Sequence, residues 1–293
     1  MIVTIHNDQL TLTADTLGAQ MQSITSYKGT EYLWNGDERY WKGRAPVLFP
    51  FVARLKDKTY TVNGGTYQMK IHGFASACEF EVAEQTESSV TFALRDNEVT
   101  RAQYPFAFLF KVRYALKEST VEVTYTVDNP ADEMLHFGLG GHPGFNVPLK
   151  EGTSFEDYYL RFSQPCEPDR VGFSSEILVS GVDKRYELED GQIIRLRHDL
   201  FDHDAIVLKN MAKSVTIASD KTKRYVTVSY PQMPYVGFWH AERKAAPYVC
   251  VEPWVSLPAR DGVIEDFACK GDLIHLPGHG SYENTWYITI GEE

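Results

Sequence analysis

Short runs in which apolar and polar residues alternate recur along almost the whole chain. In residues 119–127 every second residue is apolar, and Glu122, Thr124 and Thr126 stand between the apolar positions. Because successive side chains of a strand point to opposite faces, this pattern predicts a half-buried strand. Comparable segments rich in Val, Ile, Thr, Phe and Tyr predict further strands at 2–5, 10–13, 89–94, 106–114, 224–230 and 285–290.

Residues 59–71 contain the strongest turn signal. Asn63-Gly64-Gly65 stands between two alternating arms, and Asn and Gly tolerate the positive φ of tight hairpin turns, so a β-hairpin is expected. Helical periodicity is scarce, and the segment 98–104 before Pro105 predicts a single turn of helix. Many short strands without helical crossovers predict an all-β fold, a large antiparallel β-sandwich, in one domain over residues 1–293.

Composition and charge narrow the possible partners. The 293 residues are 43% hydrophobic and 24% charged, which argues against disorder. The net charge is −11, from 29 Lys+Arg against 40 Asp+Glu, and the sequence contains no basic run. Both features argue against nucleic acid as a binding partner. A small ligand with one phosphate remains compatible, because it needs only one or two cations. Aromatic residues make up 13%, and they serve both strand surfaces and ring-binding clefts.

The N-terminus and the cysteines indicate the compartment. Residues 1–8 lack the basic start and apolar centre of a signal peptide, and no stretch approaches the ~18 apolar residues of a membrane span. Cysteines 78, 166, 250 and 269 form no Cys-x-x-Cys pair. We therefore expect free thiols in a cytoplasmic protein without a membrane partner.

Two segments superficially suggest cofactor or metal sites. Residues 138–144 are glycine-rich, but Pro143 stands where a dinucleotide loop needs its third glycine, and no helix is predicted to follow. Residues 198–204 contain clustered His and Asp. Their spacing matches no fixed ligand pattern, so a polar loop is favoured and no metal site is predicted.

Three short segments combine a titratable residue with Gly, Pro or aromatic neighbours, and an apolar run that ends in a cation precedes them. These segments are Lys70–Phe74, Gly140–Asn146, Tyr248–Trp254 and, preceding them, Pro46–Arg54.

Each titratable residue in these segments also has a purely structural explanation. His72 and His142 stand beside glycines and could be turn residues, and Arg54 could hold a buried acid. Glu252 lies in an apolar stretch, so it must be paired, protonated or functional. Together, two imidazoles, a carboxyl group and a guanidinium suit acid–base chemistry on a polar, neutral substrate. With aromatic faces available for a ring, this combination indicates proton transfer on a carbohydrate.

The order of these four segments resembles that of the aldose 1-epimerase (galactose mutarotase-like) family, and within it the LacX-like proteins of lactic acid bacteria. The resemblance runs over nearly the whole chain. It implies a galactose mutarotase-like β-sandwich that interconverts α and β anomers of an aldose, a hexose or hexose phosphate, without a cofactor or metal. By this resemblance Glu252 is the catalytic base at the C1 hydroxyl and His142 the catalytic acid at the ring oxygen.

The same resemblance implies the substrate-binding residues. His72 is expected near the ring oxygen and hydroxyls, and Arg54 is expected to bind sugar oxygens. An Asp that holds sugar hydroxyls is expected in residues 198–208, where Asp204 fits best and Asp202 is the alternative. The partner is then a small-molecule sugar, and both monomer and homodimer remain open.

The stretch around His72 departs from the family pattern. Typical galactose mutarotases carry an Asn-His-Leu-His-Gly-Gly-like stretch, and this chain has Lys70-Ile71-His72-Gly73-Phe74. The departure leaves room for a phosphorylated sugar or another aldose. Lys70 and Arg44 are the candidate cations for binding such a phosphate.

Two other functions stay open at this point. A non-catalytic carbohydrate-binding or regulatory protein could use the same fold, and a lyase or glycosidase would pair Glu252 with Asp204 or Asp202. The mutarotase mechanism requires His72, His142 and Glu252 to converge at one sugar-sized site. Among the aromatics, core or flanking positions are expected for Tyr125, Phe108 and Tyr225, and cleft walls for Phe74, Phe145 and Trp254.

Overall fold

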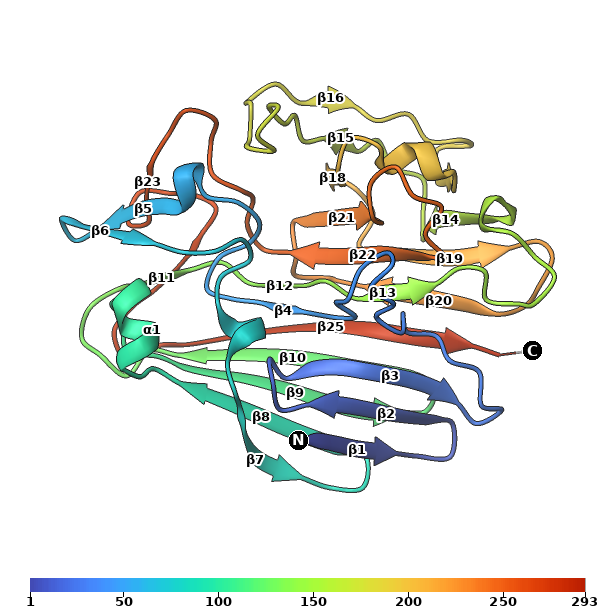
Figure 1. The fold of residues 1–293 in the computed structure, drawn as a ribbon, viewed down its shortest axis with the longest axis horizontal. Helices are drawn as coiled ribbons and strands as arrows, with labels where there is room; N and C mark the ends of the chain where they lie inside the picture. The colour runs from blue at the N-terminus through green and yellow to red at the C-terminus, as the bar shows by residue number, and fades with distance from the viewer. Residues whose placement is uncertain (293) are drawn as a thin grey trace.

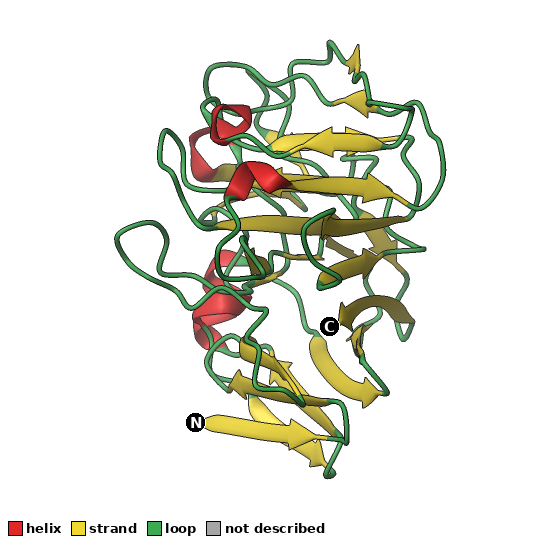
Figure 2. Ribbon diagram, turned by 90° about the vertical axis from the view of Figure 1, so that its right-hand side faces the viewer, coloured by secondary structure: helices red, strands yellow, loops and turns green. Residues whose placement is uncertain are grey.

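Strands dominate the computed structural model, which describes residues 1–292 (Figure 2). Within that range the single α-helix is α1 (Glu98–Gln103), at the place where the sequence predicts one turn. Asn97 caps it, because its side chain accepts hydrogen bonds from the Val99 and Thr100 N–H groups. The remaining helical segments are the 3-10 turns η1 (Lys56–Lys58), η2 (Ala75–Ala77), η3 (Phe155–Asp157) and η4 (His198–Phe201).

The larger sheet has nine antiparallel strands. In spatial order they are β17 (Ile193–Arg195), β14 (Tyr158–Phe162), β19 (Ser214–Ser219), β20 (Tyr225–Ser229), β25 (Ser281–Gly291), β10 (Thr120–Asp128), β9 (Leu109–Lys117), β8 (Ser89–Arg95) and β7 (Glu81–Gln85). In β10 buried and half-buried residues alternate, as the sequence predicts. The predicted segments at 89–94, 106–114, 224–230 and 285–290 all overlap strands of this sheet.

The second sheet has eight strands. Seven follow one path, which is β16 (Lys184–Arg185), β15 (Asp169–Arg170), β18 (Ile206–Lys209), β21 (Tyr235–Trp239), β22 (Tyr248–Trp254), β12 (Gly140–Gly141) and β4 (Val47–Leu48). The eighth, β13 (Gly144–Asn146), also pairs with β22. The central strand β22 is buried along its whole length, so its sequence shows no contrast between a buried and an exposed face.

Three small sheets complete the fold. They are β1 (Ile2–His6), β2 (Leu10–Asp15) and β3 (Gln20–Ser26); β11 (Leu135–Phe137) with β24 (Ile274–Leu276); and β5 (Thr59–Val62) and β6 (Gly65–Gln68) with β23 (Glu265–Asp266). The β5–β6 hairpin is confirmed, and its turn residues Asn63 and Gly64 have φ of 50° and 75°. The β23–β5 ladder is parallel.

The two large sheets face each other and enclose the main hydrophobic core (Figure 1). Phe110 of β9 stacks on Phe49, which follows β4, with ring centroids 4.4 Å apart. Phe162 of β14 meets Phe238 of β21 in the same layer. The predicted all-β antiparallel sandwich is therefore confirmed, whereas one domain over 1–293 stays a prediction. Across residues 1–292 every helical segment is too short or too polar to cross a bilayer.

The alternation along β22 places the titratable residue of this strand outside the main core. Val249 and Val251 belong to the main core between the sheets. Cys250 and Glu252 alternate with them and therefore point to the other face of the eight-stranded sheet. Chemistry at Glu252 must therefore take place on the outer face of that sheet.

Candidate active site

A cavity of about 560 Å³ lies on the outer face of the eight-stranded sheet, within the size range of small-molecule sites. All five predicted site residues line it. Arg54 and His72 lie in the loops after β4 and β6, and His142 lies between β12 and β13. Asp204 precedes β18, and Glu252 lies within β22. The sheet thus brings together residues that are far apart in the sequence.

Glu252 occupies a position in β22 where the neighbouring strand carries no side chain. Its register partner in β21 is Gly237, whose missing Cβ would stand 3.4 Å from the Glu252 Cβ. The carboxyl group is only 2% exposed. Burial, with a smaller contribution from the charge of Asp204, raises the pKa of Glu252 well above its usual value.

His142 lies directly against this carboxyl group. Its Nε2 atom is 3.2 Å from Glu252 Oε2. Within residues 1–292, His142 Nδ1 and Glu252 Oε1 are both buried without a hydrogen-bond partner. Burial, followed by the nearby His72, lowers the pKa of His142 well below its usual value. Buried polar atoms without partners are uncommon in folded proteins and are consistent with a site that binds a polar ligand.

His72 is held as a neutral hydrogen-bond donor. Its Nδ1 accepts a hydrogen bond from the Ala53 N–H at 3.1 Å, so the ring proton resides on Nε2. Burial, with the charge of Arg54, lowers the pKa of His72 to about 4. The ring centroid lies 5.4 Å from that of His142. The required convergence of His72, His142 and Glu252 is therefore met.

The left-handed backbone of His72, with φ 64°, depends on the next residue. Gly73 has φ 76°, and a Cβ at this position would lie 2.2 Å from the carbonyl oxygen of Phe49. That carbonyl accepts hydrogen bonds from the Phe74 and Ala75 N–H groups. Glycine is therefore required for the chain to pack closely enough to place His72 in the cavity.

Arg54 and Asp204 form a loose ion pair at the rim of the cavity. Arg54 Nη2 lies 3.6 Å from Asp204 Oδ2, and the Arg54 side chain is 47% exposed. Asp204 has φ 71°, and its Oδ1 accepts a hydrogen bond from the Ala205 N–H. The 3.6 Å separation leaves both groups able to bind the oxygens of a ligand. Asp202, the alternative to Asp204, lines a neighbouring cavity and not this one.

The walls of the cavity are aromatic. Trp254 lines it as predicted, and Trp41 and Trp239 line it as well. The Trp41 ring stacks on His142 with centroids 4.9 Å apart. Trp41 and Trp239 were not predicted from the sequence, although Trp41 lies in an aromatic-rich stretch with Trp34.

The other aromatic residues and cations considered for the site lie outside this cavity. Phe74 and Phe145 pack in the main core, so the prediction that they form cleft walls is wrong. Phe108 and Tyr125 are buried in the core, and Tyr225 is 37% exposed. Lys70 lines a separate cavity beside Arg54, and Arg44 Nη1 donates to the Gln22 carbonyl oxygen outside the site.

One group of residues in the described chain has the composition of a metal site. Ligand atoms of His142, Cys250 and Glu252 all lie within 4.8 Å of one another. Burial and the adjacent Glu252 raise the pKa of the Cys250 thiol well above its usual value, which disfavours the thiolate that a metal requires. Residues 198–204 are the other segment with clustered His and Asp. There His198 Nδ1 lies 3.1 Å from His240 Nε2, and Asp199 forms an ion pair with Arg197.

The His142–Glu252 pair can hold one proton and pass it between its two members. Burial favours the uncharged forms, in which Glu252 is protonated and His142 is neutral. Transfer of that proton across the 3.2 Å contact gives carboxylate and imidazolium, with the same total of protons. Such a pair can donate a proton to one ligand atom while it accepts a proton from another.

Known proteins resemble this chain in both sequence and structure. The family model for aldose 1-epimerase matches residues 1–259. The chromosomally encoded protein LacX of Lactococcus lactis subsp. lactis is 33% identical over 266 residues, which cover 88% of each protein. A galactose mutarotase related enzyme from Lactobacillus acidophilus has a TM-score of 0.95 and 35% identity, covering 100% of this chain and 98% of its own. A galactose mutarotase-like protein from Lactobacillus casei ATCC 334 has a TM-score of 0.92 and 31% identity, covering 99% and 100%.

Proposed function

The chain belongs to the aldose 1-epimerase family, and from this membership we propose that it interconverts the α and β anomers of an aldose. In the proposed reaction Glu252 accepts the proton of the C1 hydroxyl while His142 donates a proton to the ring oxygen. The ring opens to the free aldehyde, and the C1–C2 bond rotates. On closure at the other face of the carbonyl, the hydroxyl formed from the ring oxygen gives its proton back to His142, and Glu252 returns its proton to the C1 oxygen.

The contact between His142 Nε2 and Glu252 Oε2, at 3.2 Å inside the cavity, carries this proposal. Ring opening adds a proton to Glu252 and removes one from His142, and ring closure does the reverse. The pair therefore keeps the same total of protons throughout the cycle. A buried pair that favours a single shared proton suits this requirement, because neither step exchanges a proton with water.

The other residues of the cavity have binding roles in this proposal. His72 donates its Nε2 proton to a sugar oxygen, and Arg54 and Asp204 bind hydroxyl groups at the rim. Trp41, Trp239 and Trp254 would contact the apolar faces of the sugar ring. Because only protons move, the proposed reaction requires neither a cofactor nor a metal. All four cysteines are free, which supports the expectation of a cytoplasmic protein.

The test is acceleration of anomer exchange, followed by NMR magnetisation transfer on a panel of free and phosphorylated aldoses. Glu252→Gln and His142→Gln should each lower kcat by roughly 10²–10⁴-fold, because each removes one positioned proton-transfer group. Glu87→Gln is the matched control, since it makes the same change at a surface carboxylate that is 78% exposed. Wild-type rates in both active-site variants, with every sugar, would refute the proposal. Sugar binding without any acceleration would instead support the non-catalytic alternative.

A further inference from the structure

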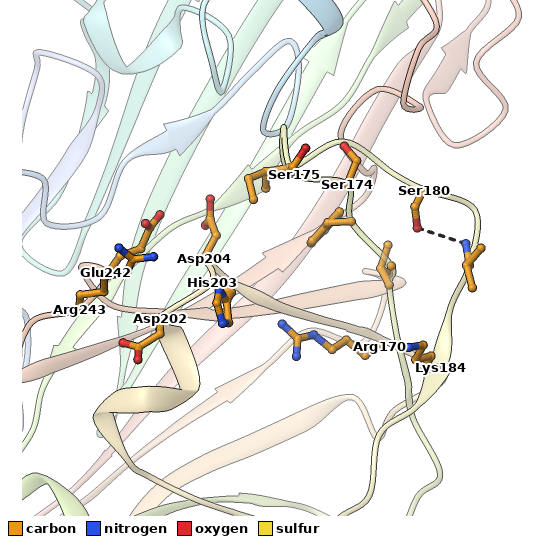
Figure 3. Close-up of a pocket in the computed structure, with 15 residues that line it drawn as sticks. Arg170, Ser174, Ser175, Ser180, Lys184, Asp202, His203, Asp204, Glu242 and Arg243 are labelled. Atoms are coloured by element: carbon orange, nitrogen blue, oxygen red, sulfur yellow. Dashed lines mark hydrogen bonds between the residues drawn. The ribbon is translucent and has the colours of Figure 1, made fainter.

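A second cavity, of about 720 Å³, adjoins the candidate active site (Figure 3). Phe173, Ile177, Asp204 and Glu242 line both cavities. A ligand held at the first cavity can therefore extend past Asp204 into the second. The chemistry of the second cavity should then reveal which group such a ligand carries at its far end.

Two cations stand directly opposite each other in this second cavity, at the edge of the eight-stranded sheet. Arg170 of β15 and Lys184 of β16 are register partners, and both line the cavity. Within residues 1–292 neither has a carboxylate oxygen at ion-pair distance. Like charges directly opposite each other destabilise a β-ladder. The free protein therefore keeps an unfavourable pair of positive charges facing the cavity.

The neighbouring pair on the same ladder shows the usual arrangement. Asp169 and Arg185 are also register partners, and Arg185 Nε lies 3.9 Å from Asp169 Oδ1. The chain has 40 acidic residues against 29 basic ones, so carboxylates are in excess. A shortage of carboxylates in the chain therefore does not account for a pair of cations without an ion-pair partner among the described residues, and a bound anion would compensate their charge.

The carboxylates of the second cavity lie apart from the Arg170–Lys184 pair. Asp202, Asp204 and Glu242 lie on one side of the cavity, together with Arg243, whereas Arg170 and Lys184 lie on the other (Figure 3). Of the three carboxylates, Asp204 and Glu242 also line the candidate active site. Ser174 and Ser180 line the cavity as well. The Ser180 oxygen accepts from the Val182 N–H at 3.3 Å, which leaves its hydroxyl proton free to donate.

We propose that the second cavity binds a phosphate group of the sugar substrate, with Arg170 and Lys184 as its ligands. This inference rests on the proposed anomer exchange and specifies its substrate as an aldose phosphate. The phosphate must be on a carbon other than C1, because ring opening requires a free C1 hydroxyl. Guanidinium, ammonium and hydroxyl groups are all donors, and phosphate oxygens are acceptors that form strong charge-assisted hydrogen bonds.

The experiment compares kcat/KM for glucose 6-phosphate with that for glucose, and for galactose 6-phosphate with that for galactose. The variants are the double substitution Arg170→Gln/Lys184→Gln and the matched control Arg185→Gln, which lies on the same ladder but does not line the cavity. The wild type should prefer the phosphorylated sugars by at least tenfold. The double variant should reduce this preference by roughly tenfold to hundredfold with little change for the neutral sugars, because hydrogen bonds to charged groups are among the stronger ones.

Stability and binding provide readouts that do not need turnover. The double variant should keep or raise the thermal midpoint of unfolding, because it relieves repulsion within the ladder. Glucose 6-phosphate should raise that midpoint in the wild type and in Arg185→Gln, and this increase should be lost in the double variant. These shifts test the phosphate site even if the protein accelerates no anomer exchange, which is the result that would refute the proposed function alone.

Three outcomes would overturn the phosphate site. The first is a wild-type protein that prefers neutral sugars. The second is a phosphate preference that survives in the double variant or is lost equally in Arg185→Gln. The third is a preference for galacturonate over galactose 6-phosphate, because this would assign the two cations to a carboxylate. Competition by inorganic phosphate against glucose 6-phosphate in the wild type, but not against glucose, would support the site.

Discussion

His72 should stay neutral at pH values where an ordinary histidine is charged. Its pKa is lowered from 6.5 to about 4, and this difference of about 2.5 units corresponds to about 3 kcal/mol. Because the folded-state pKa lies below the unfolded-state value, the unfolded chain binds the proton first as the pH falls. The folded protein therefore loses stability between about pH 6.5 and pH 4. The side chain retains partial exposure, so we expect His72 to account for about 1–2 kcal/mol of the loss between pH 7 and pH 5.

Urea unfolding of the wild type and His72→Asn at both pH values would measure this effect. Asn is suited to the comparison because it tolerates the left-handed φ of 64° and can accept the Ala53 N–H without titrating. Between pH 7 and pH 5 the wild type should lose about 1–2 kcal/mol more free energy of unfolding than the variant. Equal losses, or a His72 ring that titrates near pH 6.5 by NMR, would show that the hydrogen bond and burial do not act as described.

Two further predictions concern the same site. The value of kcat/KM should be nearly constant around neutral pH, where the His142–Glu252 pair holds one proton. It should fall in acid, where the pair gains a second proton at His142, whose pKa is lowered, and in alkali, where the pair loses its proton from Glu252, whose pKa is raised. A single titration near pH 6.5 would contradict the shared-proton pair. Gly73→Ala should destabilise the fold by at least about 2 kcal/mol in urea unfolding and raise KM, because its Cβ would meet the Phe49 carbonyl oxygen. Gly64→Ala is the matched control, since Gly64 has φ 75° and no atom within 4 Å of a new Cβ; an equal loss there would attribute the effect to backbone strain alone.

The alternating pattern predicts the strands of the nine-stranded sheet better than those of the eight-stranded sheet. In β10 the alternation of valines with Glu and Thr corresponds directly to one buried and one half-buried face. The strand β22 is buried on both faces, and β4 and β12 are only two residues long. Neither kind of strand produces a period-two pattern in the sequence. The strands of the sheet that carries the candidate site were therefore harder to predict from the sequence.

The site residues were identified from their chemistry and from the family resemblance, whereas their geometry was not predictable. Glu252 stood out because a carboxyl group in an apolar stretch requires an explanation. The sequence does not show that Gly237 lies opposite it or that Trp41 stacks on His142, because both depend on pairing and packing between distant segments. The same limit explains the error at Phe74, where sequence proximity to His72 suggested a cleft wall and the ring packs in the core.

The charges around the cavity are arranged so that one proton is left to move. The Arg54 guanidinium is offset by Asp204 at 3.6 Å. The Ala53 N–H donates a hydrogen bond to His72 Nδ1, and burial lowers the pKa of His72 to about 4. This ring therefore carries no charge near neutral pH. A charged His72 would lie beside His142 and would disfavour the imidazolium that protonates the ring oxygen in the proposed reaction. Keeping His72 neutral therefore lets the proton shared by His142 and Glu252 respond to the substrate alone.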